Sequence, residues 1–421
     1  MSQATRILLS LVIGLIAGIA LAANMPGAVP GTIAVAEPIG TAWLHSLQMT
    51  IVPLVVALLI TGVAATAEAA QAGRLAGRAI ALYVALLACS ATAAALLTPL
   101  FLEIAPIPAA SAASLRAALT GVEAIPPAPA LGDFLAGIVP TNIVKAASEN
   151  AFLSLILFAL VFAFAMTRID AKGRALLTAF FTAVRDTMLI VIEWILWIAP
   201  LGVFALALVV GAKAGTGAFG ALVHYILVVA SVGVVVSLFA YPIAVFGGRR
   251  RLGDYARAVL PSQAVAISTQ SSIATLPAMV EGASALGVPV ATSGVTLPLA
   301  VAVFRATGPA MNLAVAIYVA TWFGVPLSPA ILAVGVVVAT LTSLGSVSLP
   351  GTISYVSAIA PIASAIGAPV APLGLLVAVE TIPDIIRTLG NVMMDVATTT
   401  MLAVRGGGRD VVDDAPSRQP D

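Results

Sequence analysis

Four ionisable residues stand close together in an otherwise apolar stretch near the C-terminus. The stretch ETIPDIIRTLGNVMMD begins at Glu380 and also contains Asp384, Arg387 and Asp395. From Asp384 onward, spacings of three, four and four through Asn391 place these side chains on one face of a helix. An arginine fork suits a carboxylate and an aspartate suits an ammonium group, so this face could bind a ligand that carries both charges.

The alternative is an internal salt bridge that only holds helices together. A charge in the middle of a membrane helix costs about 2.5–3.5 kcal/mol unless it is paired or hydrated. Asp384 and Arg387 could neutralise each other, but that pair leaves Glu380 and Asp395 without a named partner. We therefore favour a polar, substrate-sized cavity beside this helix.

Composition defines the class of protein that must position this helix. The chain has 421 residues, of which 61% are hydrophobic and 9% charged, and its mean hydropathy is +1.13. Soluble domains carry roughly 25% charged residues, so we predict an all-α, polytopic protein of the lipid bilayer. The net charge of +1 argues against a nucleic-acid partner.

The residues of metal and redox sites are scarce. The single cysteine, Cys89, excludes an internal disulfide framework and a Cys-based metal cluster. His45 and His224 fall in different apolar segments, where helix packing is the expected role. Without a nucleophile–base pair, phosphate loop or metal cluster in the apolar core, we expect neither an enzyme nor a cofactor.

Apolar segments of about 20 residues, the length that crosses the hydrocarbon core, recur along the chain. Positive charges gather in alternate connections, which predicts that both termini are cytoplasmic. The segment after 405 is expected to be a disordered cytoplasmic tail (406–421), and the Ala- and Pro-rich stretch 104–131 an irregular loop. The expected spans are 6–24, 39–66, 77–102, 150–167, 184–212, 217–246, 288–320 and 370–403.

Two further apolar stretches, 256–287 and 325–367, are interrupted by Ser, Gly and Pro. They contain AISTQSSIATLPAM and LTSLGSVSLPGTISY, each with a serine-rich run that ends in Leu-Pro. Paired, broken hydrophobic segments indicate the midplane binding site of a secondary transporter, where free backbone groups face a ligand. The alternative is a pair of ordinary kinked helices whose hydroxyls bond to their own backbone.

The run DIIRTLGNVMMD resembles the last helix of the dicarboxylate/amino acid:cation symporter family, the glutamate transporter homologues. Ordered matches elsewhere are MTIVPLVVALLITGVA (49–64), IVPTNIVKAA (138–147), IAPLGVFALA (198–207), SSIATLP (271–277) and SVSLPG (346–351). The resemblance covers about 6–405 and implies eight transmembrane helices plus two re-entrant helical hairpins, related as inverted repeats.

The same resemblance implies how such a protein works. It implies a homotrimer in the cell inner membrane that moves substrate by an elevator mechanism. The scaffold helices would lie within about 6–66 and 138–212, and the transport domain within about 77–102 and 217–403.

The resemblance also assigns roles to positions of this chain. Asp384 would bind the α-amino group of the substrate and Arg387 its side-chain carboxylate. Asp395 matches a family sodium ligand and is therefore the candidate metal ligand. The other implied substrate-binding positions are Ser271, Ser272, Gly308, Val347, Ser348, Pro350, Gly351, Thr388 and Asn391.

One segment departs from the family pattern. Where the family has Asn-Met-Asp-Gly-Thr, this chain has Phe-Arg-Ala-Thr-Gly at 304–308, and Gln270 stands where many members carry arginine. We hypothesise that Arg305 takes over the electrostatic role of a sodium ion and balances Asp395 or Glu380. Alternatively, Arg305 points to the hairpin and binds substrate carboxylate directly.

We therefore predict a symporter for an acidic amino acid or C4 dicarboxylate, an anionic or zwitterionic small molecule. Its sodium coupling would be reduced or replaced by exchange or by proton coupling, with Glu380 as the titrating group. Asn391 belongs with Arg305, Glu380 and Asp395 in the charge-balancing set. One alternative is a sodium-coupled symporter of a neutral or larger amino acid. The others are an anion-conducting channel and a transport-dead binding receptor on the same fold.

Overall fold

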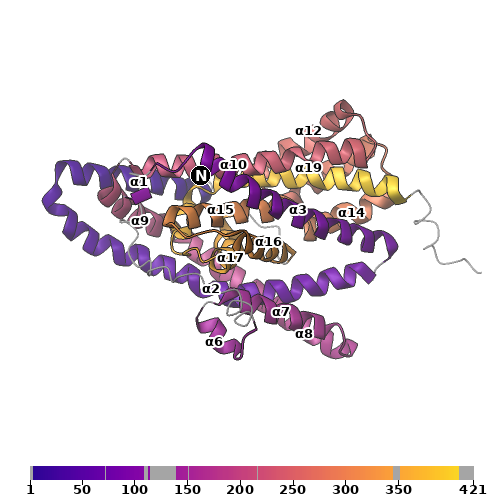
Figure 1. Cartoon of the computed structure of the whole chain (residues 1–421), viewed down its shortest axis with the longest axis horizontal. Helices are drawn as coiled ribbons and strands as arrows, with labels where there is room; N and C mark the ends of the chain where they lie inside the picture. The colour runs from indigo at the N-terminus through magenta and orange to yellow at the C-terminus, as the bar shows by residue number, and fades with distance from the viewer. Residues whose placement is uncertain are drawn as a thin grey trace, which may run out of the picture.

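The computed structural model describes residues 3–71, 73–108, 112–113, 139–149, 151–215, 217–344 and 351–406. Throughout these ranges the chain consists of helices and short connections and has no strand (Figure 1). The prediction of an all-α protein is therefore confirmed. The expected tail and most of the expected loop over 104–131 lie outside the described residues.

Long helices make up most of the molecule. Short turns of 3-10 or π type, η1 (Pro26–Ala28), η2 (Ile243–Gly247) and η3 (Val377–Val379), connect some of them. The helices are α1 (Gln3–Asn24), α2 (Val29–Gln71), α3 (Arg74–Ile104), α6 (Ile143–Ser148), α7 (Phe152–Met166), α8 (Ala171–Trp197), α9 (Ala199–Ala214), α10 (Gly217–Leu238), α11 (Ala240–Pro242), α12 (Leu252–Thr269), α13 (Ser272–Ala285), α14 (Val290–Val303), α15 (Gly308–Phe323), α16 (Pro329–Leu344), α17 (Gly351–Ala365), α18 (Leu373–Leu376) and α19 (Thr381–Gly406).

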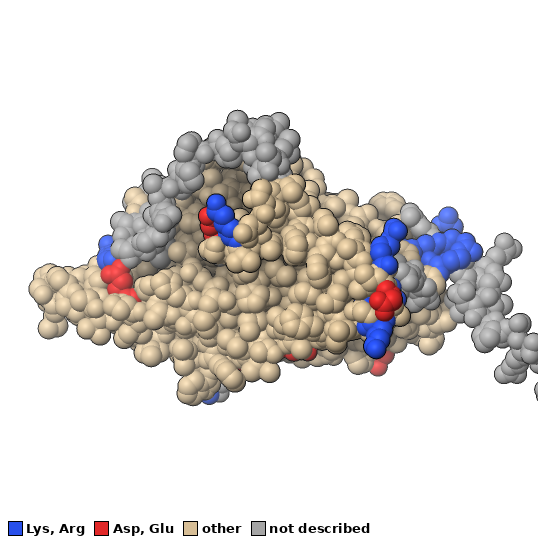
Figure 2. All heavy atoms as spheres, turned by 90° about the horizontal axis from the view of Figure 1, so that it is seen from below, with Lys and Arg blue, Asp and Glu red and all other residues tan. Residues whose placement is uncertain are grey.

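Six helical stretches of the described chain are long and apolar enough to cross a membrane. They are Thr5–Asn24, Pro26–Thr66, Arg74–Ile104, Ala171–Trp197, Phe219–Gly247 and Val290–Phe323. Figure 2 shows that one face of the molecule is largely uncharged, and most of its visible acidic and basic side chains lie toward the two ends of the long axis. This distribution is that of an integral membrane protein.

Several expected spans have different bounds. The prediction of a single span over 184–212 is wrong, because the helix is interrupted at Ile198, between α8 and α9. Pro200 occupies the first turn of α9, where a missing N–H is tolerated, and it favours a new helix start there. The span predicted over 150–167 is the 15-residue α7, which is shorter than a full membrane crossing.

The span predicted over 288–320 is also not one continuous helix. It is divided into α14 and α15, and residues 304–307 between them are not helical. Pro309 lies in the first turn of α15. Proline has no backbone N–H and its ring clashes with the preceding turn, so it favours a new helix start here over continuation of α14. The charged segment predicted within 370–403 likewise begins later than expected, because α18 and η3 precede α19.

The two interrupted stretches fold as pairs of helices. α12 and α13 pack together and meet at Gln270, whose left-handed backbone (φ 51°) makes the tight turn. The hydroxyls of Ser268 and Thr269 bond to the carbonyl of Val265, as expected for a kinked helix, but the helix itself ends. α16 packs against α17, and the segment that joins them (345–350) lies outside the described residues.

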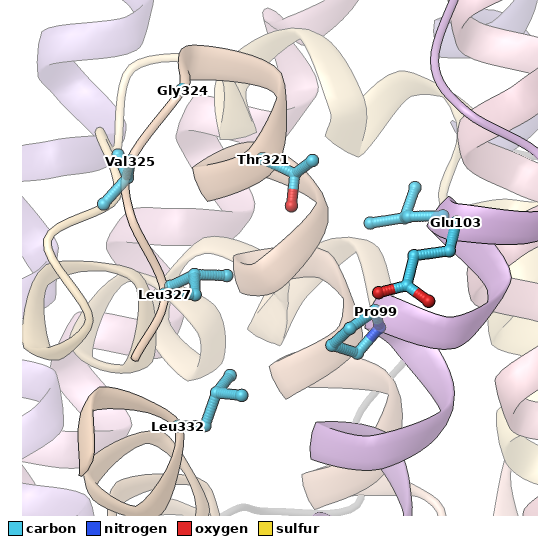
Figure 3. Close-up of a pocket in the computed structure, with 8 residues that line it drawn as sticks. Pro99, Glu103, Thr321, Gly324, Val325, Leu327 and Leu332 are labelled. Carbon is cyan, nitrogen blue, oxygen red and sulfur yellow. The ribbon is translucent and has the colours of Figure 1, made fainter. Parts of the chain in front are cut away.

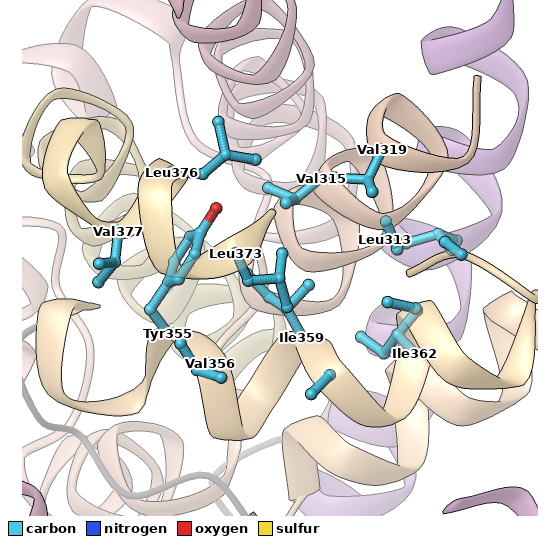
Figure 4. Close-up of a cluster of buried hydrophobic side chains, with 14 of the residues drawn as sticks. Leu313, Val315, Val319, Tyr355, Val356, Ile359, Ile362, Leu373, Leu376 and Val377 are labelled. Atoms are coloured by element: carbon cyan, nitrogen blue, oxygen red, sulfur yellow. The ribbon is translucent and has the colours of Figure 1, made fainter. Parts of the chain in front are cut away.

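Two helices are enclosed by protein rather than lipid. Nearly all of α15 is buried, packed by α3, α10, α16 and α17, and residues 391–400 of α19 are all buried. Figure 1 shows α19 running lengthwise beside α10 and α12. Figure 4 shows Leu313 and Val315 of α15 near Ile359 of α17 in the core. The charged face of α19 therefore looks into the protein.

Close backbone packing joins α1 to α9, which gives a first testable prediction. A Cβ built on Gly18 would overlap the carbonyl of Leu208 and lie 2.7 Å from the amide nitrogen of Ala212. Gly18→Ala should therefore lower the free energy of unfolding by about 1–3 kcal/mol, measured by thermal unfolding in detergent. The control Gly31→Ala adds a methyl group where nothing lies within 4 Å and should leave stability unchanged or raised. Equal effects of the two substitutions would contradict the packing argument.

Candidate functional site

The charged residues at the start of α19 form one buried ion cluster. Arg387 Nη1 donates to Asp384 Oδ1 at 3.0 Å and also to Glu380 Oε1. Arg387 is 4% exposed, and both carboxylates are at least as buried. Glu380, for which spacing alone named no partner within the helix, therefore pairs with Arg387: the two residues are two helical turns apart, and both side chains are long enough to meet.

This pairing leaves part of each side chain unused. Arg387 Nε and Nη2 and Glu380 Oε2 are buried and have no hydrogen-bond partner among the described residues. Nε and Nη2 form the side edge of the guanidinium, which matches the two oxygens of a carboxylate. Buried donors without an acceptor are destabilising, so this edge is suited to a ligand carboxylate.

Asn391, one turn beyond Arg387, is oriented by the break between α14 and α15. Its Oδ1 accepts from the amide nitrogen of Thr307 at 2.9 Å and from the hydroxyl of Thr307 at 2.8 Å. The same hydroxyl also lies 2.7 Å from the backbone carbonyl of Arg387. Since Oδ1 is occupied, Asn391 presents Nδ2, which is buried without a described partner. Asn391 thus adds a second donor suited to an anion.

Thr307 was not identified from the sequence, and it provides a second prediction. Thr307→Val keeps the shape but removes the hydroxyl, so Asn391 loses one of the two donors that orient its amide. We expect substrate affinity to fall by about tenfold, the equivalent of one hydrogen bond of about 1.4 kcal/mol. Isothermal titration of the purified protein measures this loss, and Thr307→Ser, which keeps the hydroxyl, is the control. Unchanged affinity in the valine variant would exclude this positioning role.

A second charged pair lies deeper along α19. Asp395 is 1% exposed, and neither of its carboxylate oxygens has a hydrogen-bond partner among the described residues. Arg305, in the break between α14 and α15, is 9% exposed. The hydrogen bond from Thr307 to Asn391 places this break beside α19, one helical turn before Asp395, while Arg387 balances Glu380.

The donor groups around Asp395 do not suit a sodium ion. Hard cations bind several oxygen ligands, but Asn391 Oδ1 is already occupied by Thr307. Residue 306 is an alanine, and its carbonyl accepts a hydrogen bond from Ser90. The described residues contain no cluster of three or more acidic, histidine or cysteine side chains. Among the described residues, the site therefore offers the Asp395 carboxylate, whereas Asn391 Oδ1 and the Ala306 carbonyl already accept hydrogen bonds.

The other predicted site residues are placed less directly. Ser271 caps α13 by accepting from the amide of Ala274 at 3.3 Å, and α13 packs against α19. A Cβ built on Gly308 would lie 3.5 Å from Arg305 Cβ and 3.7 Å from Ser343 Oγ, so a small side chain would fit there. Ser272 and Thr388 are buried. Gly351 begins α17, whereas Val347, Ser348 and Pro350 lie outside the described residues.

Two tyrosines beside the ion cluster were also missed by sequence reasoning. Tyr225 of α10 and Tyr355 of α17 share a 2.7 Å hydrogen bond between their hydroxyls. Both tyrosines interact electrostatically with Glu380 and Arg387. Their isolated positions in apolar runs gave no signal. His224 bonds to the Tyr318 hydroxyl and the Ala105 carbonyl, which agrees with its expected packing role.

A separate cavity of about 400 Å³ opens at the opposite end of α15. It lies between α3, the connection from α15 to α16, and the start of α16 (Figure 3). Its lining is mostly apolar, and Glu103 and Thr321 are its polar members. No residue of α19 lines it, so this cavity is distinct from the charged cluster.

Known proteins that are similar to this chain are membrane transporters. The model of the sodium:dicarboxylate symporter family matches residues 4–404. The chain is 26% identical to a proton/glutamate-aspartate symporter of Escherichia coli (strain K12), over 96% of this chain and 92% of that protein. It is 29% identical to a neutral amino acid transporter B(0) of Oryctolagus cuniculus (93% and 79% covered). It is 26% identical to a C4-dicarboxylate transport protein of Paracidovorax citrulli (89% and 82% covered). The chain therefore belongs to the sodium:dicarboxylate symporter family, a family of membrane transporters.

Proposed function

We propose that the chain is a secondary active transporter that moves an acidic amino acid or C4 dicarboxylate by symport. The observation that carries this proposal is the unused side edge of Arg387, buried next to Asp384 and one turn from the available Nδ2 of Asn391. Two donors suited to carboxylate stand beside an acid suited to ammonium. Aspartate and glutamate carry these groups, and the names of the relatives include glutamate-aspartate and C4-dicarboxylate transport.

We propose a role for each of these residues. Arg387 would hold the distal carboxylate of the substrate through Nε and Nη2, while Nη1 keeps its contact with Asp384. Asp384 would bind the ammonium group, and Asn391 the α-carboxylate. Ser271, at the turn between α12 and α13, would supply further backbone and hydroxyl contacts, and Thr388 and Gly308 would line the pocket. The predicted contacts of Val347, Ser348 and Pro350 lie outside the described residues.

Glu380 is the proposed site of proton coupling. The groups that face it are Arg387 and Asp384, together with Tyr225 from α10 and Tyr355 from α17. A substrate carboxylate on Arg387 competes with Glu380 for the same cation. Glu380, released in a buried site, would then bind a proton, because an unpaired buried carboxylate is unfavourable. Substrate and proton would thus be taken up together, with exchange as the alternative.

The remaining architecture follows from the family. We propose a homotrimer in the inner membrane with both termini cytoplasmic and eight spans plus two re-entrant hairpins, α12–α13 and α16–α17. The scaffold would comprise the helices within 6–66 and 138–212, and the transport domain those within 77–102 and 217–403. The transport domain would then carry the α19 site across the membrane as an elevator.

Uptake by the purified protein in liposomes tests this function. Saturable uptake of aspartate, glutamate or succinate, accelerated by an inward proton gradient and retained when choline replaces sodium, is the expected result. Current without saturable uptake would favour a channel, and binding without flux would favour a receptor. Sodium-driven uptake of neutral amino acids alone would favour the neutral amino acid symporter.

A further inference from the structure

The buried face of α19 contains more acid than Arg387 can balance. Glu380, Asp384 and Asp395 are three buried carboxylates, and Arg387 contacts only the first two. Asp395 lies two turns further along α19, with both oxygens lacking a hydrogen-bond partner among the described residues. A carboxyl group at this depth either takes up a proton or has a compensating positive charge, from a bound cation or from a protein group.

Arg305 is that group, and the backbone around it is held on both sides. Phe304 stacks on Tyr83 of α3 with ring centroids 4.5 Å apart, and the carbonyl of Ala306 accepts a hydrogen bond from Ser90 of α3. On the other side, Thr307 is bonded to Asn391 of α19. The break between α14 and α15 is thus fixed between α3 and α19, beside Asn391, which lies one helical turn before Asp395.

We propose that Arg305 is a resident counter-cation for Asp395, a permanent positive charge that replaces one mobile cation of the transport cycle. This inference rests on the proposed function and specifies its coupling. A mobile cation binds only at sufficient concentration, and its binding is therefore linked to that of the substrate. Arg305 is present in every state, so substrate binding to this chain has no linkage to sodium through Asp395.

The same feature makes a prediction about removing Arg305. In Arg305→Met, Asp395 loses its compensating charge and becomes an available cation ligand. The variant should then gain a dependence on sodium that the wild type lacks. Substrate affinity in choline should fall by about tenfold or more, as for loss of one partner of a buried charge pair, and sodium should restore part of it. Adding Asp395→Asn to this variant should remove the sodium dependence.

The experiment measures thermal unfolding of the purified protein and its affinity for aspartate, in sodium chloride and in choline chloride. For the wild type and Arg305→Lys, we expect the same midpoint and affinity in both salts. For Arg305→Met, we expect a lower midpoint in choline that rises in sodium. The control is Arg257→Met, which removes an exposed arginine of α12, and both of its values should match the wild type.

Two outcomes would overturn the role of Arg305. One is a wild-type midpoint or affinity that rises in sodium, which can be observed even if the methionine variant does not fold. The other is an Arg305→Met variant that behaves like Arg257→Met in both salts. Failure of the wild type to transport any substrate would instead refute the proposed function, because the thermal comparison of the two salts does not depend on transport.

Discussion

Replacing Arg387 by methionine should abolish substrate binding and strongly destabilise the protein. Arg387 is the ion-pair partner of both Glu380 and Asp384, so its removal takes away the cation that contacts these two buried carboxylates. Loss of one member of a buried ion pair costs about 3–5 kcal/mol. Thermal unfolding should therefore show a large fall in midpoint, and titration calorimetry with aspartate should show no measurable binding.

Two further variants separate the structural from the binding role of Arg387. Arg387→Lys keeps a cation for Glu380 and Asp384 but has no planar side edge, so it should recover much of the stability without recovering binding. The double variant Arg387→Met with Glu380→Gln also removes the negative charge of Glu380, so it should be more stable than Arg387→Met alone. A lysine variant that binds aspartate as tightly as the wild type would refute recognition by the Nε and Nη2 edge.

The substitution Asp384→Asn should selectively weaken binding of substrates that carry an amino group. The carboxylate of Asp384 contacts Arg387 Nη1 at 3.0 Å, and a charged hydrogen bond to ammonium contributes about 1.5–3 kcal/mol. We expect Asp384→Asn to weaken aspartate binding by about one to two orders of magnitude. Succinate, which lacks the amino group, should be affected much less.

Competition measured by thermal shift provides the readout for this prediction. The control is Asp254→Asn, in the exposed first turn of α12, which should leave both ligands unaffected. If the wild type bound succinate and aspartate equally, Asp384 would not be the ammonium ligand. Equal losses for the two ligands in Asp384→Asn would instead indicate that Asp384 acts only by orienting Arg387.

The polar face of α19 was predictable because helical spacing alone places Asp384, Arg387, Asn391 and Asp395 together. Which of these charged side chains pair with each other was not predictable, because the pairing depends on side-chain length. A salt bridge between residues three apart was considered, whereas the contact from Arg387 to Glu380 spans seven residues. Periodicity identifies a shared face, but the choice among acids on it depends on rotamers and on what covers the face.

The breaks at Ile198 and at 304–307 were harder to predict, because hydropathy continues across both of them. The available signal was proline just inside the next helix, Pro200 and Pro309. Applying that signal would have placed Thr307 in a connection rather than in a helix. Its contact with Asn391 would still have required the structure, since 84 residues separate the two.

The burial of residues 391–400 of α19 has a consequence for biogenesis. As the last helix of the described residues, α19 leaves the ribosome after α10, α12 and α14, which pack against it, have been synthesised. Its four ionisable residues oppose insertion as an isolated span, by about 2.5–3.5 kcal/mol for each central charge. Arg305 therefore precedes Asp395 into the membrane. Ribosomes stalled before α19 should hold a helical assembly whose interior is open to water, and release of the final segment would close it.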